Sequence, residues 1–196
     1  MAGFVRDRRT KRVVATFSFL EADLLRSLAA QLVELLHNEA AVPKTDEDPL
    51  AALFDFTGPV TEPDDPVLAR LFPSAYRGDE EAAGEFRRFT EGTLRDSKSR
   101  AAAAVIDGLE EAGLPAEPSG EALTIDVELD RDTAQVWLRS FTDMRLALAV
   151  RLGVEEGDED YWDALPDDDP RAQAHHIYDW MGYLQETLVM AVSAKR

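Results

Sequence analysis

Metal binding is the first chemistry that the residue spacing suggests. Glu34 and His37 are three residues apart, which is the Glu-x-x-His spacing that di-iron helical bundles use. Such a site needs a second copy of the motif and two further glutamates, and this chain has one copy. His175 and Asp179, four residues apart beside His176, form another pair. With three histidines and no cysteine in 196 residues, we expect no metal site and no cofactor.

The sequence contains no motif for nucleophilic catalysis or for phosphate transfer. There is no cysteine, no Gly-x-Ser-x-Gly elbow and no glycine-rich phosphate loop, and Ser97 stands directly before Lys98 rather than at Ser-x-x-Lys spacing. The acidic stretches 155–160 and 167–169 lack the residue order of a calcium-binding loop. We therefore expect no catalytic residues and a protein that is not an enzyme. An enzyme or metal protein of unrecognised chemistry is the alternative.

Basic residues are the minority here, so their positions are informative. The chain has 21 basic and 39 acidic residues, a net charge of −18. Because an acidic chain repels the phosphate backbone, we expect weak or no direct nucleic-acid binding. Residues 1–12 depart from this balance, with five basic side chains against one acidic, and this arm could touch DNA once a partner delivers it. The basic arm consists of Arg6, Arg8, Arg9, Lys11 and Arg12.

A second group of basic residues lies in and before an expected helix that follows Asp79. Phe86 and Phe89 are three residues apart and should both point inward. On the same geometry Arg88 faces solvent and Arg87 lies on the flank. Tyrosine and arginine are enriched at binding hot spots, which favours a surface for an acidic protein segment, whereas the structural alternative is that Arg77 and Arg87 neutralise nearby acids. The predicted partner-binding residues are Tyr76, Arg77, Arg87 and Arg88.

Two segments have the composition of half-buried strands. Residues 12–18 are rich in β-branched and aromatic side chains, and residues 123–129 alternate strictly between apolar and polar. Phe4-Val5 is a candidate hairpin partner for the first segment. A lone ribbon is marginal in water, so the simplest arrangement pairs 12–18 with 123–129 in one small sheet covered by helices.

The rest of the chain reads as helices and connections. Asp-Pro pairs at residues 48, 65 and 169 predict helix starts, because aspartate caps the first backbone N–H groups and proline suits the first turn. Residues 41–66 form a proline- and acid-rich connection, in which the apolar piece 50–56 could pack as one or two helical turns. The other predicted helices span 19–40, 67–72, 79–112, 131–152 and 170–194.

These elements predict a mostly helical α+β fold with a two- or three-stranded sheet, in a single domain over residues 1–196. No segment resembles a signal peptide, and the longest apolar run, 101–106, is far shorter than the ~20 residues of a membrane span. We expect a soluble cytoplasmic protein that does not bind membranes. Homo-oligomerisation is left open.

Four segments carry a resemblance to a known family. Two of them, DPVLARLFPSAYR at 65–77 and DEEAAGEFRRFT at 79–90, adjoin each other. The others are 137–153, which ends in DMRLALAVRLG, and YDWMGYLQETL at 178–188. As a set, and over most of the chain, they resemble an actinobacterial family of oxidative-stress transcriptional regulators, the AosR family, which is encoded beside the ClpS adaptor.

The resemblance implies a non-enzymatic regulator that works through a protein partner at promoters, such as a sigma factor. The gene neighbourhood implies an alternative in the same class, an accessory of Clp-dependent proteolysis with a Clp component as its partner. The family label is tied to a cysteine pair that senses oxidants. This chain has no cysteine, so that sensing mechanism does not carry over to it.

Overall fold

The computed structural model describes residues 3–38, 59, 61–116, 124–166 and 168–194. Most of these residues are helical, and the mostly helical α+β class predicted from the sequence is confirmed. The strands are β1 (Val5–Arg6), β2 (Val13–Ser18) and β3 (Thr124–Leu129). The helices are α1 (Phe19–Asn38), α3 (Pro66–Leu71), α4 (Glu80–Glu111), α5 (Arg131–Leu152), α6 (Glu159–Asp163) and α7 (Pro170–Ser193).

The small sheet joins two strands that are far apart in the sequence. β2 pairs with β3 in an antiparallel ladder that runs from Val13 opposite Leu129 to Ser18 opposite Thr124. β1 pairs with the other edge of β2, so the order is β1-β2-β3. The ladder predicted between residues 12–18 and 123–129 is therefore confirmed, and so is an N-terminal hairpin partner, which lies at Val5–Arg6.

Aspartate side chains cap the N-termini of several helices, as the sequence predicts. Asp65 accepts hydrogen bonds from two backbone N–H groups in the first turn of α3, and Asp169 accepts one in the first turn of α7. Proline follows each of these caps, so two of the three Asp-Pro predictions are confirmed. The third Asp-Pro pair, at residues 48–49, and the apolar piece 50–56 lie outside the described residues. Asp130 caps α5 through the N–H of Thr133.

The core forms where the inner face of the sheet meets the long helices. Alternate residues of β2 and β3, such as Phe17 and Val127, are buried, whereas their neighbours on the other face are exposed or half-buried. Phe4 packs edge-on against Phe17 and against Trp137 of α5, at ring-centroid distances of 5.7 and 6.1 Å. The strict alternation in the sequence therefore selects the face that covers the helices.

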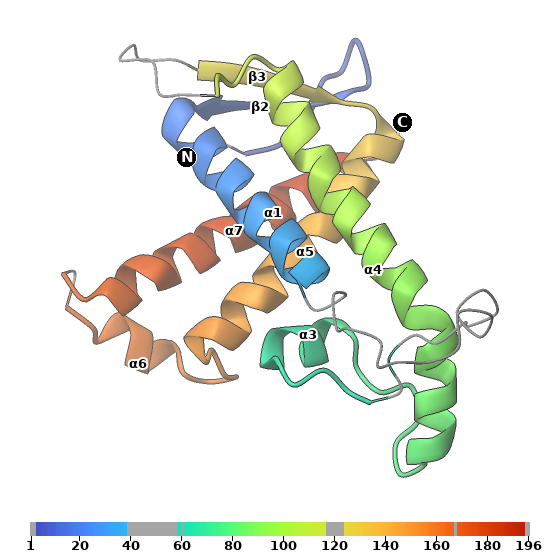
Figure 1. Cartoon of the computed structure of the whole chain (residues 1–196). Helices are drawn as coiled ribbons and strands as arrows, with labels where there is room; N and C mark the ends of the chain where they lie inside the picture. Colours follow the sequence, from blue (N-terminus) through green and yellow to red (C-terminus); the bar gives the residue numbers. More distant parts are fainter. Residues whose placement is uncertain (1–2, 39–58, 60, 117–123, 167, 195–196) are drawn as a thin grey trace.

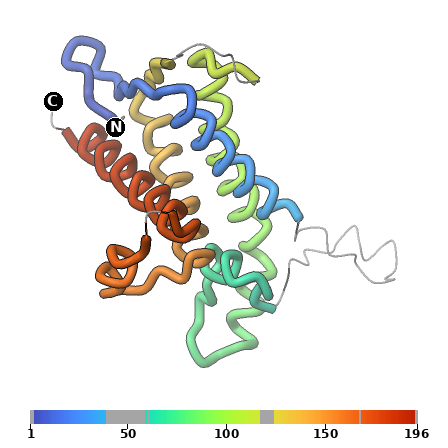
Figure 2. The backbone as a smooth tube through the Cα atoms, turned by 90° about the vertical axis from the view of Figure 1, so that its left-hand side faces the viewer, coloured from blue at the N-terminus to red at the C-terminus, as the bar shows by residue number. Residues whose placement is uncertain are grey.

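The long helices pack in neighbouring pairs, with α1 against α4, α4 against α5, and α5 against α7. The sheet lies at one end of these helices, and α3 lies at the other end (Figures 1 and 2). α4 extends from the α3 end, where its first turns lie, to the sheet (Figure 1). No helix in the described part of the chain is long and apolar enough to cross a membrane.

Candidate functional site

The first half of α4 buries charged side chains instead of apolar ones. Arg87, Glu91 and Arg95 follow one another at four-residue intervals and form a buried triad on the inner face of the helix. Arg87 Nη1 lies 2.8 Å from one carboxylate oxygen of Glu91, and Arg95 Nη2 lies 2.7 Å from the other. Glu91 is only 1% exposed, and each of its two carboxylate oxygens binds one arginine.

The arginines of the buried triad also bind the ends of two other helices. Arg87 Nη1 donates to the backbone carbonyl of Phe72, which follows α3, and Arg95 Nη1 donates to the carbonyl of Leu36 near the end of α1. The Arg95 guanidinium lies 4.7 Å from the centroid of the Phe72 ring. Carbonyls at helix ends lack partners within their own helix, so the triad supplies these missing donors and fixes α4 against α1 and α3.

Because the triad occupies the inner side, the apolar side chains of the same helical turns face solvent. Phe86 is 45% exposed and Phe89 is 59% exposed, so the prediction that both point inward is wrong. Tyr76 packs edge-on against Phe86 with ring centroids 5.9 Å apart. We call this exposed surface the α4 aromatic face, and it consists of Tyr76, Phe86, Phe89 and Leu94.

The structure separates the four predicted partner-binding residues into two groups. Tyr76, Arg77 and Arg88 are exposed, in agreement with a role on the surface. Arg87 is not on the flank but buried in the triad, which agrees with the structural alternative for that residue. Arg88 lies 5.8 Å from the ring centroid of Phe89, and neither Arg77 nor Arg88 has an ion-pair partner among the described residues.

Two hollows border the α4 aromatic face. One has a volume of about 180 Å³ and lies between α3 and α4, where Leu71, Phe86 and Leu94 contribute to its wall. The other, of about 620 Å³, is bordered by Tyr76 and is lined with the carboxylates of Glu62, Glu80, Glu81 and Glu85. The face therefore combines exposed aromatic rings with two nearby exposed arginines, Arg77 and Arg88, and with an acidic border.

The basic arm predicted at residues 6–12 forms the base and turn of the β1–β2 hairpin. Arg8, Arg9, Lys11 and Arg12 are exposed, whereas Arg6 is partly buried and donates to the carbonyl of Ala194 after α7. Arg12 contacts Glu128 of β3, with 3.5 Å between its Nε and a carboxylate oxygen. The arm is thus a compact turn rather than an extended tail.

The histidines do not assemble into a metal centre in the described residues, where no group of three metal-ligating side chains occurs. His37 is exposed, and its Nε2 lies 3.2 Å from the hydroxyl of Ser99. His175 stacks on Trp162 at a centroid distance of 4.5 Å, and its Nδ1 lies 3.3 Å from Asp179. These contacts are those of structural histidines that join neighbouring elements.

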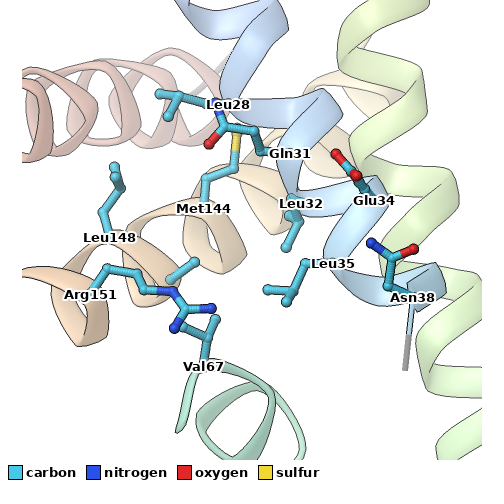
Figure 3. Close-up of a pocket in the computed structure, with 11 residues that line it drawn as sticks. Leu28, Gln31, Leu32, Glu34, Leu35, Asn38, Val67, Met144, Leu148 and Arg151 are labelled. Carbon is cyan, nitrogen blue, oxygen red and sulfur yellow. The ribbon is translucent and has the colours of Figure 1, made fainter. Parts of the chain in front are cut away.

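An apolar groove lies between α1, α3 and α5, on the part of α1 that carries Glu34 (Figure 3). Its volume is about 320 Å³, and its walls combine four leucines, Val67, Met144 and Ala147 with the polar side chains of Gln31, Glu34, Asn38 and Arg151. At its mouth Arg151 binds Asp65, with 2.7 Å between the guanidinium and the carboxylate. Although burial alone raises the pKa of Asp65, hydrogen bonds from Arg151 and from two backbone N–H groups outweigh it and lower that pKa below its usual value.

Comparison with known proteins places this arrangement in a family. The family described as a domain of unknown function, DUF2017, matches residues 1–192. The chain belongs to the DUF2017 family. Proteins named "Oxidative stress regulator AosR" from Mycobacterium tuberculosis and Mycobacterium bovis are 30% identical to it over 191 residues, covering 90% of this chain and 80% of theirs. No solved structure matches the chain.

Sequence reasoning placed Tyr76 on the surface of this DUF2017 chain but missed that Phe86 and Phe89 lie beside it on the outer side of α4. The rule that phenylalanine is buried led to the wrong orientation for this part of the helix. The rule fails here because charged side chains, rather than apolar ones, occupy the inner side. A signal was present in the four-residue spacing of Arg87, Glu91 and Arg95, which allows the three side chains to neutralise one another inside. The resemblance stated from the sequence is confirmed by the family match.

Proposed function

We propose that this DUF2017 chain is a non-enzymatic regulatory protein that acts by binding another protein through the α4 aromatic face. The observation that carries the proposal is the inverted first half of α4, with the charged triad inside and Phe86 and Phe89 outside. Exposed aromatic side chains that cluster on one surface are typical of interaction sites. The relatives named as oxidative stress regulators support a regulatory role.

The chemistry of the α4 aromatic face indicates what kind of segment it would bind. Apolar side chains of a partner can cover Phe86 and Phe89, while Arg77 and Arg88 offer two guanidinium groups without ion-pair partners in the described residues. Arginine binds carboxylates bidentately and adds contact area. The partner segment is therefore amphipathic and carries carboxylates beside its apolar residues.

A regulatory signal in this chain would have to arrive without thiol chemistry. The sequence contains no cysteine, so oxidants cannot form a disulfide within it. In our proposal the partner senses the oxidant or carries the signal, and this chain contributes the docking surface. The promoter-bound partner implied by the family resemblance fits this division of roles.

The test compares the proteins captured by purified variants from a lysate of the source organism. The double variant Phe86→Ser/Phe89→Ser should lose a specific partner, and Leu20→Ser is the matched control because Leu20 is 77% exposed on another helix. Mass spectrometry identifies the captured proteins, and thermal melting checks that all variants fold. Identical capture by the double variant and the control would refute the proposed surface.

A second pair of variants tests the acidic character of the partner segment. Arg88→Glu reverses a charge beside Phe89, whereas Arg100→Glu makes the same change at an exposed position farther along α4. We expect only Arg88→Glu to weaken the partner identified with the first variants. Equal binding by both charge-reversed variants would mean that carboxylates of the partner do not contact Arg88.

A further inference from the structure

The turn of the β1–β2 hairpin concentrates positive charge on an acidic molecule. Residues 1–12 contain five basic side chains and one acidic, a net +4, whereas the remaining residues contain 16 basic and 38 acidic, a net −22. The exposed cations of this turn, which we call the hairpin tip, are Arg8, Arg9, Lys11 and Arg12. Both views show the turn projecting at the edge of the molecule (Figures 1 and 2).

The hairpin tip is held in one conformation by hydrogen bonds within the turn, most of which the Asp7 side chain accepts. One carboxylate oxygen of Asp7 accepts hydrogen bonds from the N–H of Arg9 at 2.9 Å and from the N–H and hydroxyl of Thr10 at 2.5 and 2.9 Å. Asp7 also exchanges backbone hydrogen bonds with Lys11 and Arg12 across the turn. Lys11 has a φ of 63°, a left-handed conformation that a non-glycine residue adopts only when its surroundings impose it.

The base of the hairpin is anchored, but three of the four tip cations form no ion pair within the described residues. Arg6 binds the end of α7, and Arg12 binds both the carboxylate and the backbone carbonyl of Glu128. Within the described chain, no carboxylate forms an ion pair with Arg8, Arg9 or Lys11. The one acidic side chain of the turn, Asp7, is engaged in its hydrogen bonds.

The residue types of the tip determine the chemistry of a ligand. Between Arg8 and Arg12 there is no apolar side chain, so recognition would rest on charge and on hydrogen bonds from guanidinium and ammonium groups. Exposed acids, Asp126, Glu128 and Asp130, lie close to the base of the hairpin on and after β3. A DNA duplex is broad and densely charged and would bring further phosphates against these acids, whereas an extended acidic peptide can contact the tip alone.

We propose that the hairpin tip is a second docking site, which binds an acidic, apolar-poor segment of a protein. This site lies at the sheet end of the molecule, and the α4 aromatic face lies at the opposite end (Figures 1 and 2). The 32 residues of α4 alone span ~48 Å between these ends. The chain can therefore hold two protein segments at the same time, and the second site stands whether or not the first is correct.

The experiment is an NMR titration of the isotope-labelled full chain with a short unstructured Glu–Gly peptide at low salt. We expect shifts of the backbone amides and arginine side chains in residues 7–12. Arg8→Gln/Arg9→Gln should weaken binding of the peptide about fivefold, because it removes two exposed guanidinium–carboxylate contacts that each change affinity about two- to threefold. The matched control, Arg100→Gln/Arg139→Gln, removes the same charge at exposed positions of α4 and α5 outside both proposed sites and should leave binding unchanged.

Two results would overturn the second docking site. Shifts that avoid residues 7–12, or equal weakening by both double variants, would show that the peptide responds only to overall charge. Tighter binding of a short DNA duplex than of the peptide, with shifts in the same residues, would identify the tip as a nucleic-acid contact instead. Neither result concerns Phe86 or Phe89, so the function proposed for the α4 aromatic face is tested separately.

Discussion

Glu91 is the side chain on which the local structure around α4 depends most. It is 1% exposed, and its carboxylate neutralises two arginines that in turn satisfy carbonyls of Phe72 and Leu36. Taking charges out of water is costly, and such a network is stable only when every member is paired. The triad is therefore an arrangement that fixes the rotation of α4 rather than a source of large net stability.

We predict that Glu91→Ala lowers the free energy of unfolding by about 3–5 kcal/mol, because it removes the buried carboxylate that both guanidinium groups bind. Glu85→Ala removes the same charge from an exposed position of the same helix and should cost less than ~0.5 kcal/mol. Urea unfolding followed by circular dichroism measures both values. Similar stability of the two variants would show that the triad is not maintained in solution.

Asp65 is a second residue whose charge matters, because it both caps α3 and binds Arg151. Its pKa is lower in the folded chain than the ordinary value, since the hydrogen bonds that it accepts outweigh its burial. A lowered pKa means that the stabilisation is present at neutral pH and is lost as the pH falls through the folded pKa.

We predict that Asp65→Asn lowers the free energy of unfolding by about 1 kcal/mol at neutral pH, because asparagine still caps the helix but does not bind Arg151 as an ion pair. The difference from the unsubstituted chain should be constant above about pH 5 and shrink below about pH 4. Asp64→Asn, at the exposed neighbouring position, is the control. A difference that grows on acidification would contradict the assigned role of Asp65.

At the scale of an element, α4 shows what a sequence pattern can and cannot reveal. Its second half is a regular amphipathic helix, and its limits at 79–112 were predicted to within one residue at each end. The buried stripe of that half continues toward the N-terminus in steps of three and four residues, where its positions are charged. A prediction that only apolar residues are buried does not find these positions. From the C-terminal end the stripe runs Leu109, Val105, Ala102, Lys98, Arg95, Glu91 and Arg87.

Two glycines of α4 differ in what surrounds them. Gly92 is exposed, and a Cβ atom there would meet nothing within 4 Å. A Cβ at Gly108 would lie 2.8 Å from Cζ2 of Trp137, a fully buried side chain whose indole N–H donates to the carbonyl of Ala104. The absence of a Cβ at Gly108 therefore makes room for this tryptophan of α5 against α4.

We predict opposite effects for the same substitution at these two glycines. Gly92→Ala should raise the free energy of unfolding by about 1 kcal/mol, because alanine favours the helix more than glycine does. Gly108→Ala should lower it by about 1–3 kcal/mol, because the indole of Trp137 must move within a packed core. Denaturant unfolding of the two variants measures the sign directly, and a stabilising Gly108→Ala would contradict the close packing.

At the scale of the whole molecule, the sheet could be predicted from the sequence. The proposed interaction surfaces could be predicted only in part. Alternation in two distant segments specified which residues face inward, and the need to pair each strand then gave the ladder between β2 and β3. The groove between α1, α3 and α5 and the contacts of the buried triad depend on how helices rotate and pack. Such packing follows from tertiary contacts, which a periodic pattern in one segment does not contain.

The two ends of the molecule also differ in chemistry. The sheet end carries the cationic hairpin tip, whereas the α3 end carries aromatic rings beside two arginines and an acidic border. A net charge of −18 favours solubility and suppresses non-specific contact with other acidic surfaces. The partners that we propose would therefore recognise local features rather than the molecule's overall charge.

Site-specific photo-crosslinking in living cells of the source organism tests the central claim most directly. A benzophenone amino acid replaces Phe89 in one strain and Leu20, the exposed control on α1, in the other. We predict that position 89 yields a crosslink to one defined protein, mapped by mass spectrometry to an amphipathic segment rich in carboxylates, and that position 20 does not. The absence of a crosslink at position 89, the same products from both positions, or a crosslinked segment that is basic would contradict the account.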